Sequence, residues 1–73
     1  MESKQTTSRT KNFLSARELQ ILKLYTRFAK KKIAAMLFID YETVKTHLNN
    51  CVKKLRASNV RHATYMAMRM GLF

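Results

Sequence analysis

The side chains best suited to specific binding chemistry lie between positions 45 and 49. They are Lys45, the next residue, Thr46, and Asn49, which follows Thr46 by three positions. That spacing places all three on one face of an α-helix. Lysine can donate to the acceptors of guanine, asparagine can pair with a donor and an acceptor of adenine, and threonine offers a methyl or a hydroxyl group. The pattern indicates a helix that can contact base edges. An ordinary solvated helix face has a similar composition and stays open as the alternative.

Further polar side chains flank this face and could contact phosphate. Thr43, Lys53 and Lys54 lie where a duplex backbone would pass, and His47 borders the outward side. Such contacts orient a protein on a duplex without reading its sequence. Three more cations stand at the N-terminal end of a short apolar stretch: Lys30, Lys31 and Lys32. There they oppose the helix dipole, which a phosphate would compensate, although a solvated charge run explains them equally well.

Residues that could support catalysis or hold a metal are few. The chain has no glycine-rich loop and no paired carboxylates beyond Asp40 and Glu42, which suit a helix cap and a first-turn partner of the helix dipole. Two histidines and the single Cys51 do not form a ligand set for a structural metal. We therefore expect no catalytic residue, no metal and no cofactor, and a Cys51 thiol that is buried.

The helix that carries the polar face is predicted from Tyr41 to about Arg56, with Asp40 as its cap. Its other side has an apolar residue at spacings of four, three and four positions: Val44, Leu48, Cys51 and Leu55. One such stripe must face a core. This helix is therefore expected to pack by one face and to present the other.

The sequence before this helix predicts two more helices. Ser15 and Glu18 form a capping box, and Leu14 with Leu19 can close a hydrophobic staple over the same turn. The apolar pattern then continues as far as Phe28. A helix of about two turns follows, on Ile33, Ala34 and Leu37.

A fourth helix is expected from His62 to Met70, after a connector at 59–61 and with Gly71 as a left-handed cap. It has two apolar stripes: Ala63, Met66, Ala67 and Met70 on one, and Tyr65, Met68 and Leu72 on the other. A small domain needs only one stripe for its core. We assign the first to the core and Tyr65, Met68 and Leu72 to a dimer contact.

Composition and charge agree with a small all-α domain. The 73 residues include no proline and one glycine, which disfavours a sheet of short strands. Residues 1–12 form a flexible basic arm in this interpretation, and residues 13–73 form the folded domain. A net charge of +11 predicts a polyanionic partner. The longest apolar run has seven residues, too few to span a membrane.

Residues 14–73 resemble the LuxR-type, or GerE-type, helix-turn-helix domain of bacterial transcription regulators. The resemblance rests on Leu14 to Glu18, Ile33-Ala34 with Leu37 and Ile39, Thr43 to Leu48, Asn50, Lys54-Leu55, Asn59, Ala63, Ala67 and Gly71-Leu72. It implies a four-helix fold, recognition by the third helix and dimerisation through the fourth. It also supports Lys45, Thr46 and Asn49 as base readers, and Thr43 and the lysines at 30–32 as backbone contacts. Arg56 departs from the glycine that is usual in the family at that position.

We therefore expect a stand-alone, sequence-specific regulator that binds double-stranded DNA as a dimer on two half-sites, with the helix at about 41–56 in the major groove. Its expected location is the cytoplasm, at the bacterial nucleoid, and RNA polymerase or a regulatory protein is a further candidate partner. Three alternatives stay open. They are a basic helical module that binds an acidic protein, a sigma-factor-like promoter-reading domain, and a peptide that lies on a membrane surface.

Overall fold

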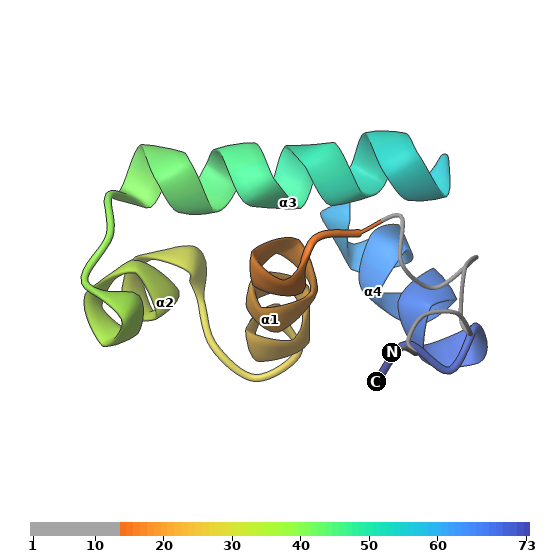
Figure 1. Cartoon of the computed structure of the whole chain (residues 1–73), viewed down its shortest axis with the longest axis horizontal. Coiled ribbons are helices and arrows are strands. Elements are labelled where there is room, and N and C mark those ends of the chain that lie inside the picture. The colour runs from red at the N-terminus through yellow and green to blue at the C-terminus, as the bar shows by residue number, and fades with distance from the viewer. Residues whose placement is uncertain (1–13) are drawn as a thin grey trace, which may run out of the picture.

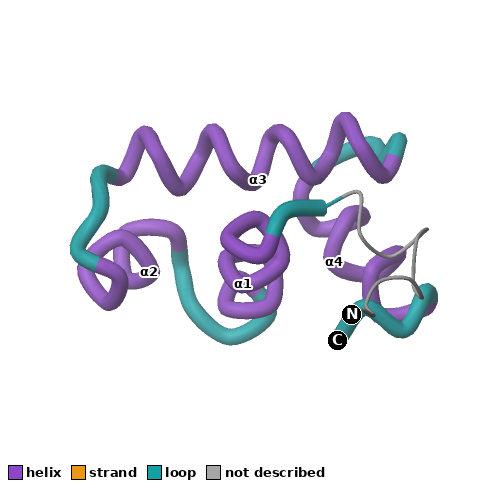
Figure 2. Tube along the Cα trace, viewed as in Figure 1, coloured by secondary structure: helices purple, strands orange, loops and turns teal. Residues whose placement is uncertain are grey.

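The computed structural model describes residues 14–73, and within them it contains four helices and no strand (Figures 1 and 2). The helices are α1 (Ala16–Tyr25), α2 (Lys30–Leu37), α3 (Tyr41–Leu55) and α4 (Val60–Arg69). In Figure 1, α3 crosses the top of the molecule and contacts α1, α2 and α4 beneath it. This arrangement confirms the predicted all-α, four-helix fold. The predicted basic arm at 1–12 lies outside the described residues.

The start of α1 is the capping box predicted from the sequence. The backbone N–H of Ser15 donates to Oε1 of Glu18 at 2.9 Å, and the N–H of Glu18 donates to Oγ of Ser15 at 3.0 Å. The end of α1 differs from the prediction, because the helix ends at Tyr25 rather than continuing to Phe28. The hydroxyl of Thr26 donates to the carbonyl of Lys23 at 2.6 Å, a local bond that competes with further helical turns.

Both ends of α3 are set by backbone geometry. Asp40 occupies the N-cap position, as expected, but its side chain makes no capping hydrogen bond; only its charge acts on the helix terminus. The residue after each of α2 and α3 is left-handed, with φ of 57° at both Phe38 and Arg56. Phe38 is 94% exposed, so its ring does not pack in the core.

The fourth helix begins at Val60, two residues earlier than predicted. The expected connector at 59–61 is therefore wrong, because the Asn59 side chain caps the helix by accepting from the N–H of His62 at 2.8 Å. Gly71 is left-handed with φ of 75°, as predicted. Its N–H donates to the carbonyl of Met68 at 3.1 Å, and the next N–H, that of Leu72, closes the Schellman motif.

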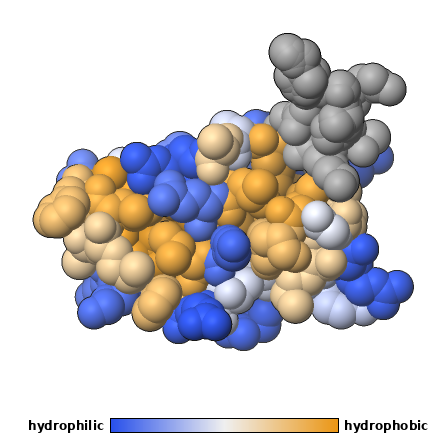
Figure 3. Space-filling model, turned by 60° about the horizontal axis from the view of Figure 1, so that its bottom comes forward, coloured by the Kyte–Doolittle hydropathy of each residue, from blue (hydrophilic) through white to orange (hydrophobic). Residues whose placement is uncertain are grey.

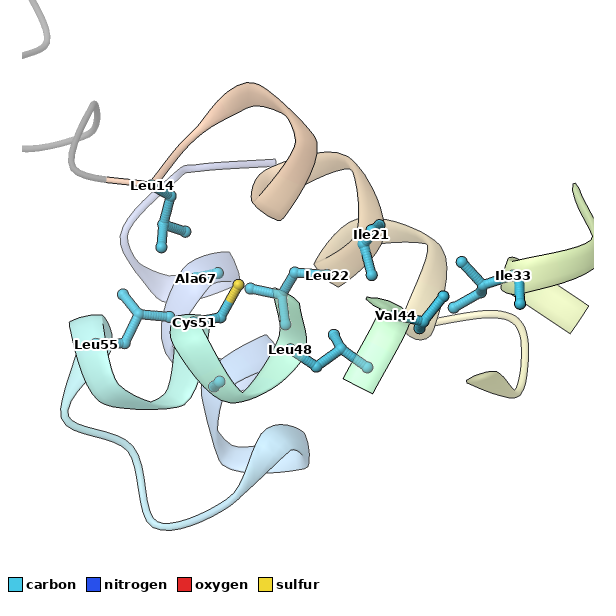
Figure 4. Close-up of a cluster of buried hydrophobic side chains, with 11 residues drawn as sticks. Leu14, Ile21, Leu22, Ile33, Val44, Leu48, Cys51, Leu55 and Ala67 are labelled. Atoms are coloured by element: carbon cyan, nitrogen blue, oxygen red, sulfur yellow. The ribbon is translucent and has the colours of Figure 1, made fainter. Parts of the chain in front are cut away.

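The core lies between α3 and the other three helices. All four residues of the predicted α3 stripe are buried, and Figure 4 shows them among the other side chains of the core cluster. Burying a leucine such as Leu48 contributes roughly 1.5–3 kcal/mol. The core also includes Leu14, Ile21, Leu22, Ile33, Ala34, Ala63 and Ala67.

The two predicted stripes of α4 separate in part, because Leu72, a member of the predicted dimer stripe, packs against the core. Ala63 and Ala67 are fully buried, and Met66 packs partly against the core. Met70 departs from the prediction because it is 41% exposed, lying past the last helical turn at Arg69. Among residues 14–73, no helix combines the length and the apolar character needed to cross a bilayer.

Candidate nucleic-acid interface

The outward face of α3 brings together the side chains proposed from the sequence to read bases. Thr46 and Asn49 are exposed, and Lys45 is half-buried next to them. Residues 38–40 join α2 to α3, so the two helices form a helix-turn-helix in which α3 is the second member. Because its other face is buried against three helices, α3 presents its polar face as part of a fixed scaffold.

Lys45 has two partners within its own helix. Its Nζ lies 3.4 Å from Oε2 of Glu42 and 5.2 Å from the centroid of the Tyr41 ring. The carboxylate of Glu42 is 79% exposed, so this ion pair contributes little to folding and can open at small cost. The ammonium is nevertheless held near the first turn of α3.

Lys54 is engaged in the fold. Its Nζ donates to Oε1 of Glu18 at 2.8 Å, and this bond joins α3 to the start of α1. Burial raises the pKa of Glu18. That effect is outweighed by the bonds from Lys54 and the Ser15 N–H and by the charges of Lys54 and His47, so the pKa lies below its ordinary value. Sequence reasoning missed this pair because its members are 36 residues apart.

The remaining predicted phosphate contacts on α3 differ in exposure. Lys53 is exposed, whereas Thr43 and His47 are half-buried. Among the described residues, the buried Nδ1 of His47 has no hydrogen-bond partner. One side of the ring is therefore enclosed by the protein, and its electrostatic effect is the smallest of the causes that lower the pKa of Glu18.

The N-terminal end of α2 collects more positive charge than the sequence suggested. Its N-cap, Ala29, has no capping side chain, and the three predicted lysines at 30–32 occupy the first turn. A pocket of about 520 Å³ opens there. The fold brings two further cations, Arg27 and Arg61, to its lining, together with Tyr25, Thr26, Phe28, Ala29, Lys30, Lys31 and Tyr41. Arg61 could not be assigned to this place from the sequence because it comes from the first turn of α4.

The outward side of α4 exposes large apolar side chains next to Arg61 and Arg69, and Arg69 donates to the hydroxyl of Tyr65 at 3.2 Å. Tyr65 is 56% exposed and Met68 57% exposed, while Leu72 is half-buried against the core. An adjoining groove of about 300 Å³ is lined by Lys23, Leu24, Thr26, Arg27, Met68 and Phe73. Figure 3, which brings the side away from α3 forward, shows broad apolar surface broken by hydrophilic side chains.

Cys51 is a structural residue. It is fully buried, and its Sγ donates to the carbonyl of Glu18 at 3.6 Å. Burial, together with the nearby Glu18 charge, raises the pKa of the thiol to about 11, which keeps it protonated and unreactive. Within residues 14–73, no three His, Cys, Asp or Glu side chains are grouped closely enough to hold a metal ion.

The sequence matches a known protein family. The model of the family "bacterial regulatory proteins, luxR family", named GerE, matches residues 12–67. The transcriptional activator protein CarR of Pectobacterium carotovorum subsp. carotovorum is 41% identical over 61 residues, which are 82% of this chain and 25% of that protein. A nitrate/nitrite response regulator protein homolog of Haemophilus influenzae is 41% identical over 54 residues, 73% of this chain and 26% of that protein.

A shorter relative matches along most of its own length. The spore germination protein GerE of Bacillus subtilis is 33% identical over 63 residues, which are 85% of each chain. By contrast, this chain spans about a quarter of the CarR and response-regulator sequences. No solved structure matches it at a significant level. The family match over most of the chain, together with the four-helix fold, shows that this protein belongs to the LuxR family of bacterial regulatory proteins.

Proposed function

We propose that this protein binds double-stranded DNA in a sequence-specific manner and regulates transcription, with α3 as the recognition helix in the major groove. The observation that carries the proposal is the division of α3 into one buried apolar face and one outward polar face. A helix of 15 residues that is fixed by its inner side can enter a groove without reorganising the fold. Membership of a family of regulatory proteins supports the same function.

Base reading falls to Lys45, Thr46 and Asn49 in this proposal. Lys45 donates to the N7 and O6 acceptors of guanine, and Asn49 pairs with adenine. Thr46 contacts a thymine methyl or accepts a hydrogen bond. Their positions on successive turns of one helix face suit contacts to neighbouring base pairs.

Phosphate contacts surround the reading face. Thr43, His47 and Lys53 extend along α3, and the lysines at 30–32 approach from the uncapped end of α2. Lys54 keeps its bond to Glu18, but it is 40% exposed and has further N–H groups to offer a phosphate. The cationic pocket at α2 supports this arrangement, because Arg27 and Arg61 add positive charge beside the lysines.

The bound form is a homodimer on two half-sites, with contacts through Tyr65, Met68 and Leu72. Exposed apolar residues on α4 support this assignment, since a two-fold axis there brings identical patches together. Linking two recognition helices raises affinity through a higher effective concentration, without any new contact to DNA.

The test is selection of bound fragments from random duplexes, followed by alignment of the enriched sequences. The expected result is a motif with two-fold symmetry, whose repeat gives the half-site spacing. Binding without an enriched motif would show that the protein binds polyanions without sequence specificity. Absence of duplex binding would favour an acidic protein partner instead.

A further inference from the structure

The outward face of α3 contains one acidic side chain, Glu42, directly among the proposed base readers. Glu42 precedes Lys45, Thr46 and Asn49 by three, four and seven residues, so all four lie along the same line of the helix. It is the only acidic residue of α3. A carboxylate in this place weakens the attraction of the face for phosphate.

Stabilisation of the helix dipole does not account for this position. An acidic residue in the first turn stabilises a helix wherever around the axis it points. Asp40 already supplies a negative charge at the N-cap, away from that line. Glu42 therefore lowers nonspecific affinity at a position where a carboxylate can also reject some base pairs and accept another.

We propose that Glu42 determines specificity by accepting a hydrogen bond from the N4 amino group of cytosine, beside the guanine contacted by Lys45. This inference rests on the proposed function. In the major groove, cytosine presents a donor and its paired guanine presents two acceptors on one edge. The Glu42 carboxylate and the Lys45 ammonium, 3.4 Å apart at Oε2 and Nζ, offer the complementary acceptor and donor side by side.

Tyr41 contributes to this arrangement as a positioning residue. Its ring lies 5.2 Å from Nζ of Lys45, so the ammonium has a carboxylate and an aromatic face as neighbours. These neighbours limit the directions in which a long, flexible lysine side chain extends. Glu42 and Lys45 therefore lie side by side on the part of α3 that would face the groove.

The experiment repeats the selection from random duplexes with wild type, Glu42→Gln and Glu42→Ala. Glutamine keeps the shape but prefers adenine, so Glu42→Gln should change the preference at one position from cytosine toward adenine. Glu42→Ala should reduce discrimination there by about fivefold or more. Both variants should bind a duplex without the motif more tightly than wild type, because a negative charge is removed.

Asp40→Asn is the matched control, since it removes an exposed carboxylate at the same end of α3 without altering the reading line. It should raise nonspecific affinity and leave the base preference unchanged. Melting curves verify that each variant folds. An unchanged motif with both Glu42 variants overturns the inference while the proposed function stands. A wild-type selection that yields no motif overturns the proposed function, and the inference with it.

Discussion

The outward faces of α3 and α4 differ in composition, although the inward faces of both helices pack into the same core. Each helix buries an apolar stripe in one core, through Leu48 and Cys51 in α3 and through Ala63 and Ala67 in α4. Outside, α3 presents amide, hydroxyl and ammonium groups, whereas α4 presents a phenol ring and thioethers beside the exposed Arg61, His62 and Arg69. Core packing leaves the outer composition free. The proposed partners differ accordingly, with a polyanion for α3 and a second copy of the chain for α4.

The largest expected effect comes from a charge on the α4 face. Met68→Glu should separate the dimer, because an isologous contact places the two new charges near each other. Affinity for a full symmetric site should then fall by about 100-fold or more, while affinity for one half-site changes little. Sedimentation gives the mass, melting verifies the fold, and titration with both duplexes gives the affinities.

Met36→Glu is the matched control for Met68→Glu, since Met36 is a partly exposed methionine on α2. It should alter neither the mass nor the ratio of full-site to half-site affinity. If Met68→Glu unfolds the protein, Met68 belongs to the core. An unchanged mass with Met68→Glu would remove α4 as the dimer contact.

Two lysines test the division of labour around α3. Lys45→Ala should cost about 1–3 kcal/mol on the preferred site and flatten discrimination at one base position. Lys31→Ala should weaken all sequences alike and make the salt dependence shallower by about one unit. Titrations of matched and mismatched duplexes at several salt concentrations separate the two. Equal loss of specificity in both variants would contradict the assigned roles.

Structural features that depend on residues close together in the sequence could be predicted. Contacts between residues that are far apart in the sequence could not. The capping box at Ser15 and the buried stripe from Val44 to Leu55 follow from spacings of three and four residues, so periodicity sufficed. The Glu18–Lys54 pair joins residues 36 apart, and the pocket at α2 depends on Arg61 arriving from α4. No short-range sequence pattern predicts such long-range contacts.

Two smaller errors share one physical cause, which is competition between local hydrogen bonds. Asparagine is common both in loops and at helix N-caps. Asn59 is an N-cap, because its side chain accepts a hydrogen bond from the His62 N–H. Thr26 ends α1 through a bond to a carbonyl of the preceding turn. The base-reading and dimer roles were inferred from residue type and resemblance, and they stay predictions until the variants above are measured.

The two ion pairs on either side of α3 should differ in their effect on stability. Glu18→Gln should destabilise the protein by about 1–2 kcal/mol at neutral pH, since a buried carboxylate loses its charged bond to the partly exposed Lys54. Glutamine can still accept from the Ser15 N–H, so the capping box survives. Glu42→Gln, at an exposed pair, should change stability by less than about 0.5 kcal/mol.

Acidification provides the second test of Glu18. Its pKa is lowered in the folded protein, so its contribution is complete above the ordinary glutamate pKa and is lost as pH falls through the lowered value. The unfolding free energies of wild type and Glu18→Gln should therefore approach each other as the pH falls below the ordinary glutamate pKa, and they should become equal below the lowered pKa. Denaturant titrations across that range measure the difference. A gap that persists in acid would assign the effect to packing rather than to charge.

An effect smaller than that of Glu18→Gln distinguishes the C-terminal ends of α3 and α4. Both helices end in a left-handed residue, Arg56 at φ 57° and Gly71 at φ 75°. The left-handed region costs a residue with a side chain roughly 1–2 kcal/mol, part of which glycine returns as unfolded-state entropy. Arg56→Gly should therefore stabilise the protein by about 0.5–1 kcal/mol, and Gly71→Ala should destabilise it by a similar amount.

Nothing lies within 4 Å of a Cβ added at Gly71, so the stability lost in Gly71→Ala would report backbone strain and not a steric clash. Denaturation midpoints of the two variants measure both signs. If Arg56→Gly is destabilising, the arginine side chain has a role in α3 that the backbone geometry does not explain.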